Sequence, residues 1–265
     1  MQNAILGLDI GTSSTKAILF DLSGRELALA QQAYPLSTPR AGWAEQDPEQ
    51  VWQALLATLR QIVKRAGKGR RILAMSLATQ SGSLIAAQSD GTPLAPMITW
   101  LDSRAEGIVQ RWRAAGLEED VRRSSGWQLQ SGLSLPSIAW LKEFRPDIFN
   151  AADRFLGVHD FLAGRLTGEF AVDLSGGAEM QLLDISTGQW SQTLRALVGV
   201  GPAQLSRLIP AGQVIAPITA EVSRLTGLTP ETPLISGGHD QTCAALALGL
   251  LNPGQLMLAT GTAWV

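Results

Sequence analysis

The sequence predicts an α/β fold, because strand-like and helix-like segments alternate along the chain. Apolar strands separated by short turns open it, at residues 4–8, 16–22 and 26–32. This alternation is typical of a β-meander. A segment with helix boundary signals follows, and toward the other end an apolar strand and an apolar helix are joined by Gly237 and Gly238. Mixed patterns of this kind are typical of sheets covered by helices.

The first helix has clear signals at both ends. Asp47 is a predicted N-cap, Pro48 occupies the first helical position, and Gly67 follows the last turn. Between them, apolar residues repeat at helical spacing, at Val51, Leu55, Leu59, Ile62 and Val63. Strand-like segments follow at 72–78, 84–88 and 97–100, and helix propensity dominates from Ala105 onward.

The second half of the chain is less regular. Residues 135–167 are predicted to be largely helical, the Gly-rich stretch 168–177 to be a loop, and 190–208 to contain short helices. The elements predicted after Thr232 are a buried strand at 233–236, a tight turn at Gly237-Gly238, a helix at 239–251 and a strand at 255–260.

The end of the chain is unusual for a domain. A strand followed at once by Gly261, Thr262 and the last residues would have no element to cover it, so we expect an incomplete protein. A short echo supports this interpretation, because L-x-x-G-T and a small residue occur at both 8–13 and 258–263. A strand that runs into Gly-Thr turns N–H groups and a hydroxyl toward one point, so two such loops would hold a triphosphate.

Composition and charge exclude several classes of function. With 21 Lys+Arg and 23 Asp+Glu the formal net charge is −2, which indicates neither a nucleic-acid partner nor an anionic membrane. Hydrophobic residues make up 45% and charged residues 17%, which favours a large core over disorder. The single cysteine, Cys243, rules out an internal disulfide, and the N-terminus has no signal-peptide pattern. We expect a cytoplasmic protein.

The segment from Asp9 to Lys16 combines a carboxylate, a glycine, hydroxyl residues and a cation in one turn between strands. Gly11 lets the backbone approach a phosphate, to which Thr12 and Ser13 can donate hydrogen bonds. Lys16 offsets phosphate charge, and Asp9 could hold Mg²⁺ through water. An ordinary polar hairpin turn explains the same residues equally well, since neither a Walker A loop nor a dinucleotide-binding fingerprint is present.

Asp240 is the second candidate, in the segment GGHDQ between a buried strand and an apolar helix. A helix N-terminus stabilises a carboxylate, so Asp240 should be ionised and free to accept a proton as a general base. A simple N-cap role explains the same position equally well.

Other reactive residues point less clearly to a chemistry. His159 and His239 are the only histidines and show no zinc-ligand spacing, and Ser81 lacks the full nucleophile-elbow motif. Trp100 is the exception among the tryptophans, since it stands close to Asp102 and Arg104, and an indole face beside polar groups is suited to a sugar ring.

Taken together, these segments resemble the FGGY carbohydrate kinases, the group that contains xylulokinase, ribulokinase, gluconokinase and glycerol kinase. Five segments carry the resemblance, in the family's order: GLDIGTSSTKAILFDLSG (7–24), AGWAEQDPEQVW (41–52), TWLDSRA (99–105), GGHDQ (237–241) and TGTAW (260–264). The resemblance implies an actin-like ATPase fold related to ribonuclease H. It further implies a sugar-binding N-terminal lobe over 1–231 and the start of a nucleotide-binding lobe over 232–265.

The resemblance also implies roles for individual residues. Asp240 matches the family's general base, and Asp9 matches the residue near Mg²⁺. The residues that match the two phosphate loops are Gly11, Thr12, Ser13, Lys16, Gly261 and Thr262. The residues that match the sugar pocket are Thr79, Gln80, Ser81, Trp100, Asp102, Arg104, Asp240 and Gln241.

The activity that the resemblance implies is the ATP- and Mg²⁺-dependent phosphorylation of a sugar, polyol or sugar-acid hydroxyl, with this chain alone inactive. Gln80-Ser81 replaces the Met-His pair of xylulokinases and gluconokinases, and Ser137 replaces a signature lysine, so the substrate is left open. Two alternatives remain: a non-catalytic half-kinase that binds a sugar as a regulatory or scaffolding module, and an actin-like ATPase of the chaperone or filament kind. The expected partner is a small carbohydrate, and a homodimer is left open.

Overall fold

A six-stranded sheet organises the protein, whose computed structural model describes residues 2–67 and 69–259. The strand order is β13-β14-β5-β1-β2-β3. These strands are β1 (Gln2–Ile10), β2 (Ser14–Asp21), β3 (Glu26–Ala33), β5 (Arg70–Thr79), β13 (Val214–Pro217) and β14 (Pro233–His239). β1, β2 and β3 pair antiparallel, whereas β5 runs parallel to both β1 and β14. The predicted meander and α/β class are confirmed.

The helix α1 (Pro48–Ala66) packs on β2 and β3, and its boundaries are those that the sequence predicts. The Asp47 side chain accepts a hydrogen bond from the backbone N–H of Glu49, and Gly67 takes a positive φ of 70° after the last turn. Such caps satisfy backbone groups that the helix leaves open at its ends. Leu55, Leu59 and Ile62 from its apolar face are fully buried in the main core.

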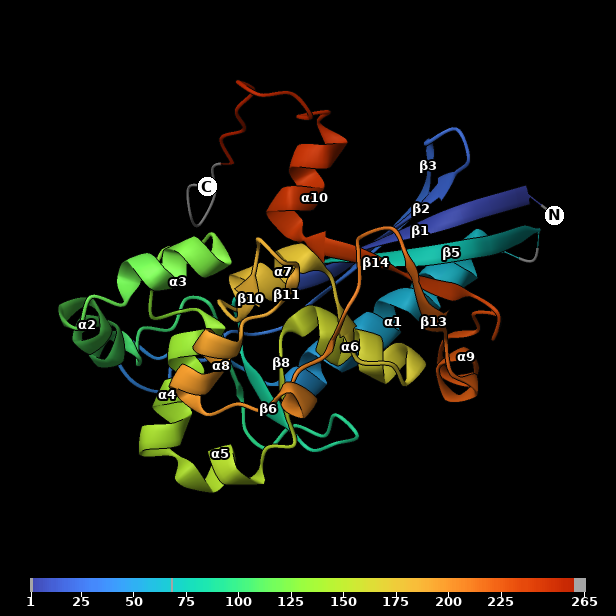
Figure 1. The fold of residues 1–265 in the computed structure, drawn as a ribbon. Coiled ribbons are helices and arrows are strands. Elements are labelled where there is room, and N and C mark those ends of the chain that lie inside the picture. The colour runs from blue at the N-terminus through green and yellow to red at the C-terminus, as the bar shows by residue number, and fades with distance from the viewer. Residues whose placement is uncertain (1, 68, 260–265) are drawn as a thin grey trace.

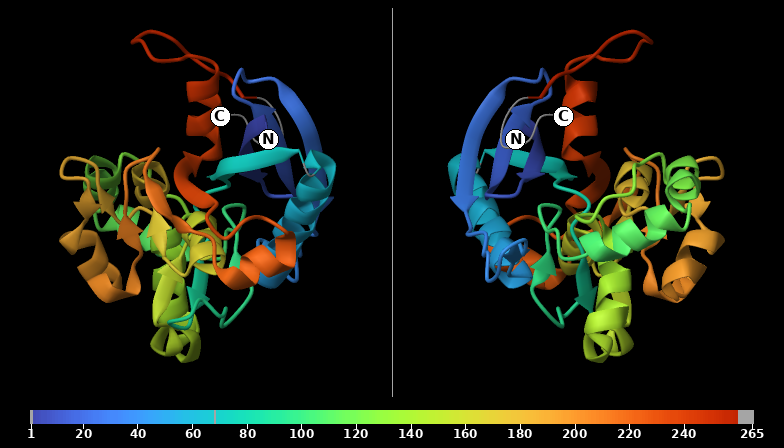
Figure 2. Two further views of the ribbon diagram at one scale, coloured as in Figure 1. Left: turned by 90° about the vertical axis from the view of Figure 1, so that its right-hand side faces the viewer. Right: turned by 90° about the vertical axis from the view of Figure 1, so that its left-hand side faces the viewer.

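Helices lie on both sides of the sheet. In Figures 1 and 2, α1 and α6 (Val158–Thr167) lie on one side, and α10 (Asp240–Ala247) stands on the other. α10 follows β14 directly and contributes no buried residue, and Leu246 is 64% exposed. α9 (Ala220–Thr226) packs against α1.

A second hydrophobic core lies beside the first, under a group of mostly short helices. Its fully buried residues include Leu129, Leu135, Ile138 and Phe155. The helices in this region are α2 (Glu106–Ala114), α3 (Glu118–Ser125), α4 (Ser134–Phe144), α5 (Pro146–Ala151), α7 (Leu174–Glu179), α8 (Gln192–Val198) and the 3₁₀ turn η1 (Pro202–Gln204). Figure 1 shows α2 to α5 gathered at the end of the molecule away from the N-terminus.

Short two-stranded pairings lie outside the six-stranded sheet. They are β4 (Glu45–Gln46) with β7 (Met97–Ile98), β6 (Ile85–Ala87) with β8 (Arg154–Leu156), β9 (Ala171–Val172) with β12 (Arg207–Leu208), and β10 (Leu183–Asp184) with β11 (Gln189–Trp190). No helix among the described residues is long and apolar enough to cross a membrane.

Three local predictions are wrong. The stretch 168–177 is not a continuous loop, because it contains β9 and most of α7, which begins where Asp173 accepts from the N–H groups of Ser175 and Gly176. Gly237 and Gly238 are not a tight turn but the end of β14, where the register shifts against β5. Residues 255–259 form no strand.

The glycines of β14 are needed for a close approach between strands. A Cβ on Gly237 would lie 1.8 Å from the carbonyl oxygen of Leu77 on β5. The proposed boundary between residues 231 and 232 stays a prediction. β14 itself is hydrogen-bonded into the sheet formed by the preceding strands.

Candidate active site

The carboxyl ends of three parallel strands meet at one edge of the sheet. Thr79, the last residue of β5, pairs with Ile10 at the end of β1 and with His239 at the end of β14. The loop after β1 and the helix after β14 therefore start from neighbouring positions, although more than half of the sequence separates them. In open α/β sheets, ligands bind beyond the carboxyl ends of the strands.

The loop after β1 contains the phosphate-binding candidates and is held from several sides. Gly11 donates its N–H to the carbonyl of Ser14 at 3.1 Å. The hydroxyl of Tyr34 donates a hydrogen bond to the carbonyl of Gly11. Nε2 of Gln46 donates a hydrogen bond to the carbonyl of Thr12, at 2.6 Å. Burial raises the pKa of Tyr34 to about 12, so its hydroxyl stays a donor at neutral pH. These contacts fix the backbone at the turn.

Asp9 and Lys16 face each other across the β1–β2 hairpin, where they occupy paired positions. Lys16 Nζ lies 3.3 Å from Oδ2 of Asp9, and the two side chains are 43% and 44% exposed. Both charges are therefore accessible to a ligand above the strand ends. The described residues contain no cluster of three or more acidic, histidine or cysteine ligands for a metal. A metal at Asp9 would then depend on waters and phosphate oxygens, which is usual for Mg²⁺.

The predicted sugar-pocket residues Gln80 and Trp100 are joined to the phosphate loop. The backbone N–H of Gln80 donates a hydrogen bond to the carbonyl of Ile10, and its side-chain Nε2 donates one to Oε1 of Gln46. Trp100 donates Nε1 to the hydroxyl of Thr12 at 2.9 Å. The sugar-pocket and phosphate-loop candidates thus form one connected network rather than two separate sites.

Asp102 and Arg104 form a buried ion pair. Arg104 donates Nε and Nη2 to the two carboxylate oxygens of Asp102, at 2.9 and 2.8 Å, and Nη2 also reaches Glu45 at 2.7 Å. Asp102 further accepts from the backbone N–H of Ala44. The Asp102 side chain has 0% exposure and that of Arg104 has 4%. These contacts favour positioning of the chain around Ala44, and direct sugar contact by either residue stays a prediction.

Asp240 is the first residue of α10, directly after the strand end at His239. Its side chain is 29% exposed, and its Oδ1 lies 3.1 Å from Nε2 of His239. The N-cap is His239 rather than Asp240, so the alternative of a simple capping role loses its support. Gln241 follows on the helix, with its Oε1 buried and without a partner among the described residues.

Several buried acceptor atoms around the strand ends have no hydrogen-bond partner among the described residues. They are Thr79 Oγ1, Gln80 Oε1 and Gln241 Oε1. Buried polar atoms in native proteins are nearly always paired, so an unpaired group calls for an unseen partner such as water or a ligand. Acceptors of this kind suit the hydroxyl donors of a polyol.

Sequence reasoning missed three contributors to this site: Tyr34, Gln46 and Glu179. Gln46 lies in the AEQDP segment that carries part of the resemblance, so the resemblance could have identified it as a candidate. Glu179 gave no such signal, because it lies just after the predicted Gly-rich loop 168–177, where no element was predicted, and His239 is distant from it in the sequence. Gly261 and Thr262 lie outside the described residues.

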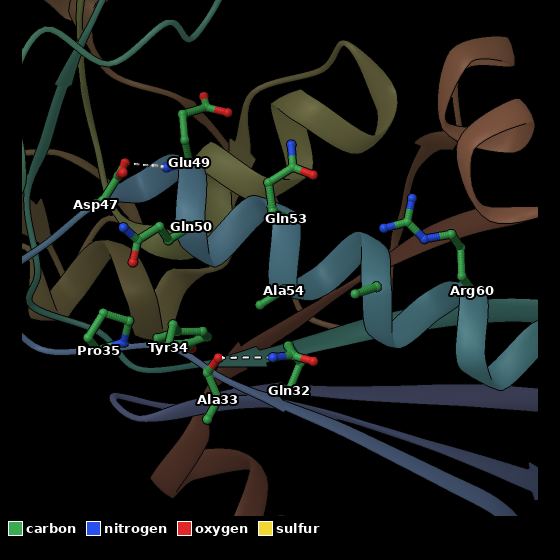
Figure 3. Close-up of a pocket in the computed structure, with 11 residues that line it drawn as sticks. Gln32, Ala33, Tyr34, Pro35, Asp47, Glu49, Gln50, Gln53, Ala54 and Arg60 are labelled. Carbon is green, nitrogen blue, oxygen red and sulfur yellow. Dashed lines mark hydrogen bonds between the residues drawn. The ribbon is translucent and has the colours of Figure 1, made fainter.

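A separate groove of about 500 Å³ lies between β3 and α1 (Figure 3). Gln32, Pro35, Gln53 and Arg60 are among its lining residues. It is open to solvent and lies along the edge strand, apart from the ends of β5 and β14. Tyr34 connects it to the site, because its hydroxyl is bonded to Gly11.

The fold and the site agree with a family of known proteins. A sequence model described as the "FGGY family of carbohydrate kinases, N-terminal domain" matches residues 4–247. The chain therefore belongs to the FGGY family of carbohydrate kinases, and the actin-like fold expected from the resemblance is confirmed.

The chain spans about half the length of the relatives that it matches. It is 30% identical over 262 residues to a gluconokinase from Bacillus subtilis, with 99% of this chain and 51% of that protein covered. It is 29% identical over 263 residues to a xylulose kinase from Escherichia coli, with 98% and 53% covered. The solved xylulose kinase from Rhodospirillum rubrum superposes with a TM-score of 0.92 at 31% identity, with 96% and 52% covered.

Proposed function

We propose that this chain supplies the sugar-binding half of a carbohydrate kinase, which transfers a phosphoryl group from ATP to a hydroxyl of a ketose, polyol or sugar acid. The observation that carries the proposal is the position of Asp240. This partly exposed carboxylate lies at a helix start beside the end of β5, whose other neighbour, β1, leads into the Gly11–Ser13 turn. A base and a phosphate loop on one sheet edge are the parts that phosphoryl transfer needs.

In the reaction, Asp240 accepts the proton of the attacking substrate hydroxyl as the new O–P bond forms and the bond from the γ-phosphorus to the bridging oxygen breaks. Thr12 and Ser13 orient the transferred group with N–H and hydroxyl donors, Gly11 lets the phosphate approach the backbone, and Lys16 offsets its charge. MgATP supplies the phosphoryl group, with Asp9 placed to hold the metal through water. Thr79, Gln80, Ser81, Trp100 and Gln241 line the sugar side. Gly261 and Thr262 are proposed to complete the phosphate loops.

The composition of the chain indicates the cell compartment and the kind of partner expected for such an enzyme. The net charge of −2 and the single cysteine support a cytoplasmic protein with a small-molecule substrate and no nucleic-acid partner.

The test uses the natural polypeptide that carries this chain. Release of ADP is measured with a panel of ketopentoses, polyols and aldonates, for the wild type, Asp240→Asn and the control Asp147→Asn, whose carboxylate is 64% exposed on α5. We expect one substrate class to stimulate ADP release, and Asp240→Asn to lower kcat by roughly 10²- to 10⁴-fold with sugar affinity retained. Equal turnover in Asp240→Asn and the control would contradict the proposal. Sugar binding without ADP release would support the half-kinase alternative.

A further inference from the structure

A buried carboxylate and a histidine stand directly behind Asp240. Nε2 of His239 lies 3.1 Å from Oδ1 of Asp240 and 3.5 Å from Oε2 of Glu179. The side chains of His239 and Glu179 are 10% and 9% exposed. The first distance is that of a hydrogen bond, whereas the second is longer than one and is that of an ion pair. One imidazole therefore lies between two carboxylates, one buried and one facing the site.

Elements distant in the sequence hold this arrangement in place. Glu179 ends α7, and His239 ends β14. Ser175, on the first turn of α7, accepts the backbone N–H of His239 at 3.0 Å and donates to Asp173. The ring of Trp127 contacts that of His239 edge to face, with centroids 6.0 Å apart. The imidazole is thus fixed by backbone, ring and charge contacts.

The titratable groups around His239 come from two elements. Asp173 and Glu179 lie before and on α7, and Asp240 and Cys243 lie on α10. Burial lowers the pKa of His239, but the hydrogen bond to Asp240 and the charges of Glu179 and Asp240 outweigh it, so the net direction is upward. Burial raises the pKa of Glu179 to about 7, against the opposing effect of His239. The neighbours of the imidazole therefore favour its protonated form.

We propose that Glu179 and His239 are positioning residues for the proposed base, so that His239 holds Oδ1 of Asp240 and leaves Oδ2 to take the proton of the substrate hydroxyl. This inference rests on the proposed function. Glu179 fixes the orientation of the imidazole from behind and does not touch the reacting atoms. A carboxylate at a helix start can rotate about its side-chain bonds, and a misplacement of about 1 Å at a reacting group can cost roughly 100-fold in rate.

The first experiment follows the His239 ring by NMR in the 265-residue chain. His159 is the other histidine and is fully buried, with its ring bonded to the carbonyl of Ala171, so the spectrum contains two histidine signals, which His239→Gln assigns. We expect Glu179→Gln to lower the pKa of His239 by removing a neighbouring negative charge. The matched control is Glu169→Gln, the same substitution at an exposed residue. Thermal unfolding of both variants separates this effect from loss of the fold.

The second experiment measures kinetics in the natural polypeptide. Glu179→Gln should lower kcat roughly 10- to 100-fold while KM for the sugar changes by less than about threefold. His239→Gln, which keeps a side-chain donor toward Asp240, should retain more activity than His239→Ala, and it tests the same contact if Glu179→Gln does not fold. An effect on stability alone would leave kcat and the His239 titration unchanged.

The inference and the proposed function fail in different ways. The inference is overturned if Asp240→Asn is inactive while Glu179→Gln and His239→Ala match the Glu169→Gln control in kcat and in the His239 titration. Full activity in Asp240→Asn removes the proposed base, and the positioning role falls with it.

Discussion

The indole Nε1 of Trp100 donates to the hydroxyl of Thr12 across 88 residues of sequence, at 2.9 Å. The bond ties the turn after β1, where phosphate binding is proposed, to the segment that carries the ion pair of Asp102 and Arg104. Trp100 is itself held by the hydroxyl of Ser83, which accepts its backbone N–H at 3.2 Å. The indole therefore couples the phosphate side of the site to the sugar side.

We predict that Trp100 and Thr12 are energetically coupled. Trp100→Phe removes the N–H donor and keeps an aromatic ring, and Thr12→Val removes the hydroxyl acceptor. A hydrogen bond contributes about 1 kcal/mol, so each single variant should lose about that much stability and the double variant only slightly more. Urea unfolding of the four proteins in the cycle measures the coupling. Additive losses would show that the bond does not contribute.

Gly237→Ala should be strongly destabilising. Its Cβ would lie 1.8 Å from the Leu77 carbonyl oxygen, a contact that forces β14 away from β5 and moves the adjacent His239 and Asp240. We expect a loss of roughly 3 kcal/mol or failure to fold. The control is Gly107→Ala, at an exposed position of α2 where a Cβ meets nothing within 4 Å, and a change within about 1 kcal/mol is expected there. Similar unfolding midpoints for both variants would contradict the close approach.

Arg104→Lys should not be tolerated as a conservative change. The guanidinium is bidentate to Asp102, contacts Glu45, and stacks 3.7 Å from the ring centroid of Trp43. A lysine cannot reproduce the paired donors or the stacking, so Asp102 would be left buried with incomplete pairing. We expect a loss of about 3 kcal/mol in thermal or urea unfolding. Arg111→Lys on exposed α2, with its side chain 57% exposed, should change stability by less than about 1 kcal/mol.

The contribution of Asp160 to the stability of the fold should fall as the pH rises from acidic to neutral. Burial raises the pKa of Asp160 to about 7, against the opposing hydrogen bond from Ser206. The folded chain therefore holds a proton that the unfolded chain releases between about pH 4 and 7. The stability that the protonated Asp160 contributes therefore declines across that window.

The variant that tests this pH dependence is Asp160→Asn, which keeps the shape of the side chain and removes its titration. Urea unfolding at intervals from pH 4.5 to pH 8 should give a flatter profile for the variant than for the wild type. The same slope in both would show that Asp160 does not hold the proton. Asp153→Asn, at an exposed residue, controls for the substitution itself.

The sequence predicted the sheet well where local signals and tertiary structure agree. The meander has alternating apolar positions and short turns, and α1 has its N-cap at Asp47 and its last-turn glycine at Gly67, so each boundary is encoded within a few residues. The order of strands across the sheet, in contrast, could not be predicted from local signals. The pairing of β5 with both β1 and β14 joins segments far apart in sequence, which no local pattern specifies.

Two of the three wrong predictions share one physical cause. Glycines read as turns in isolation, but in β14 their lack of a side chain serves a close contact with Leu77, and in α7 the capping by Asp173 starts a helix in spite of Gly176 and Gly177. Tertiary contacts override local propensity in both places. The role inferred for Glu179 could not be predicted from the sequence either, because it depends on the contact with His239, which lies on another element.

The way in which α10 is attached to the rest of the molecule affects the position of the proposed base, Asp240. This helix contributes no buried side chain, and Leu246 and Leu248 on it and directly after it are 64% and 68% exposed. Asp240 is fixed at one end by β14, while the remainder of the helix has few contacts to resist a tilt. A tilt of this helix about His239 would therefore change the position of the Asp240 carboxylate.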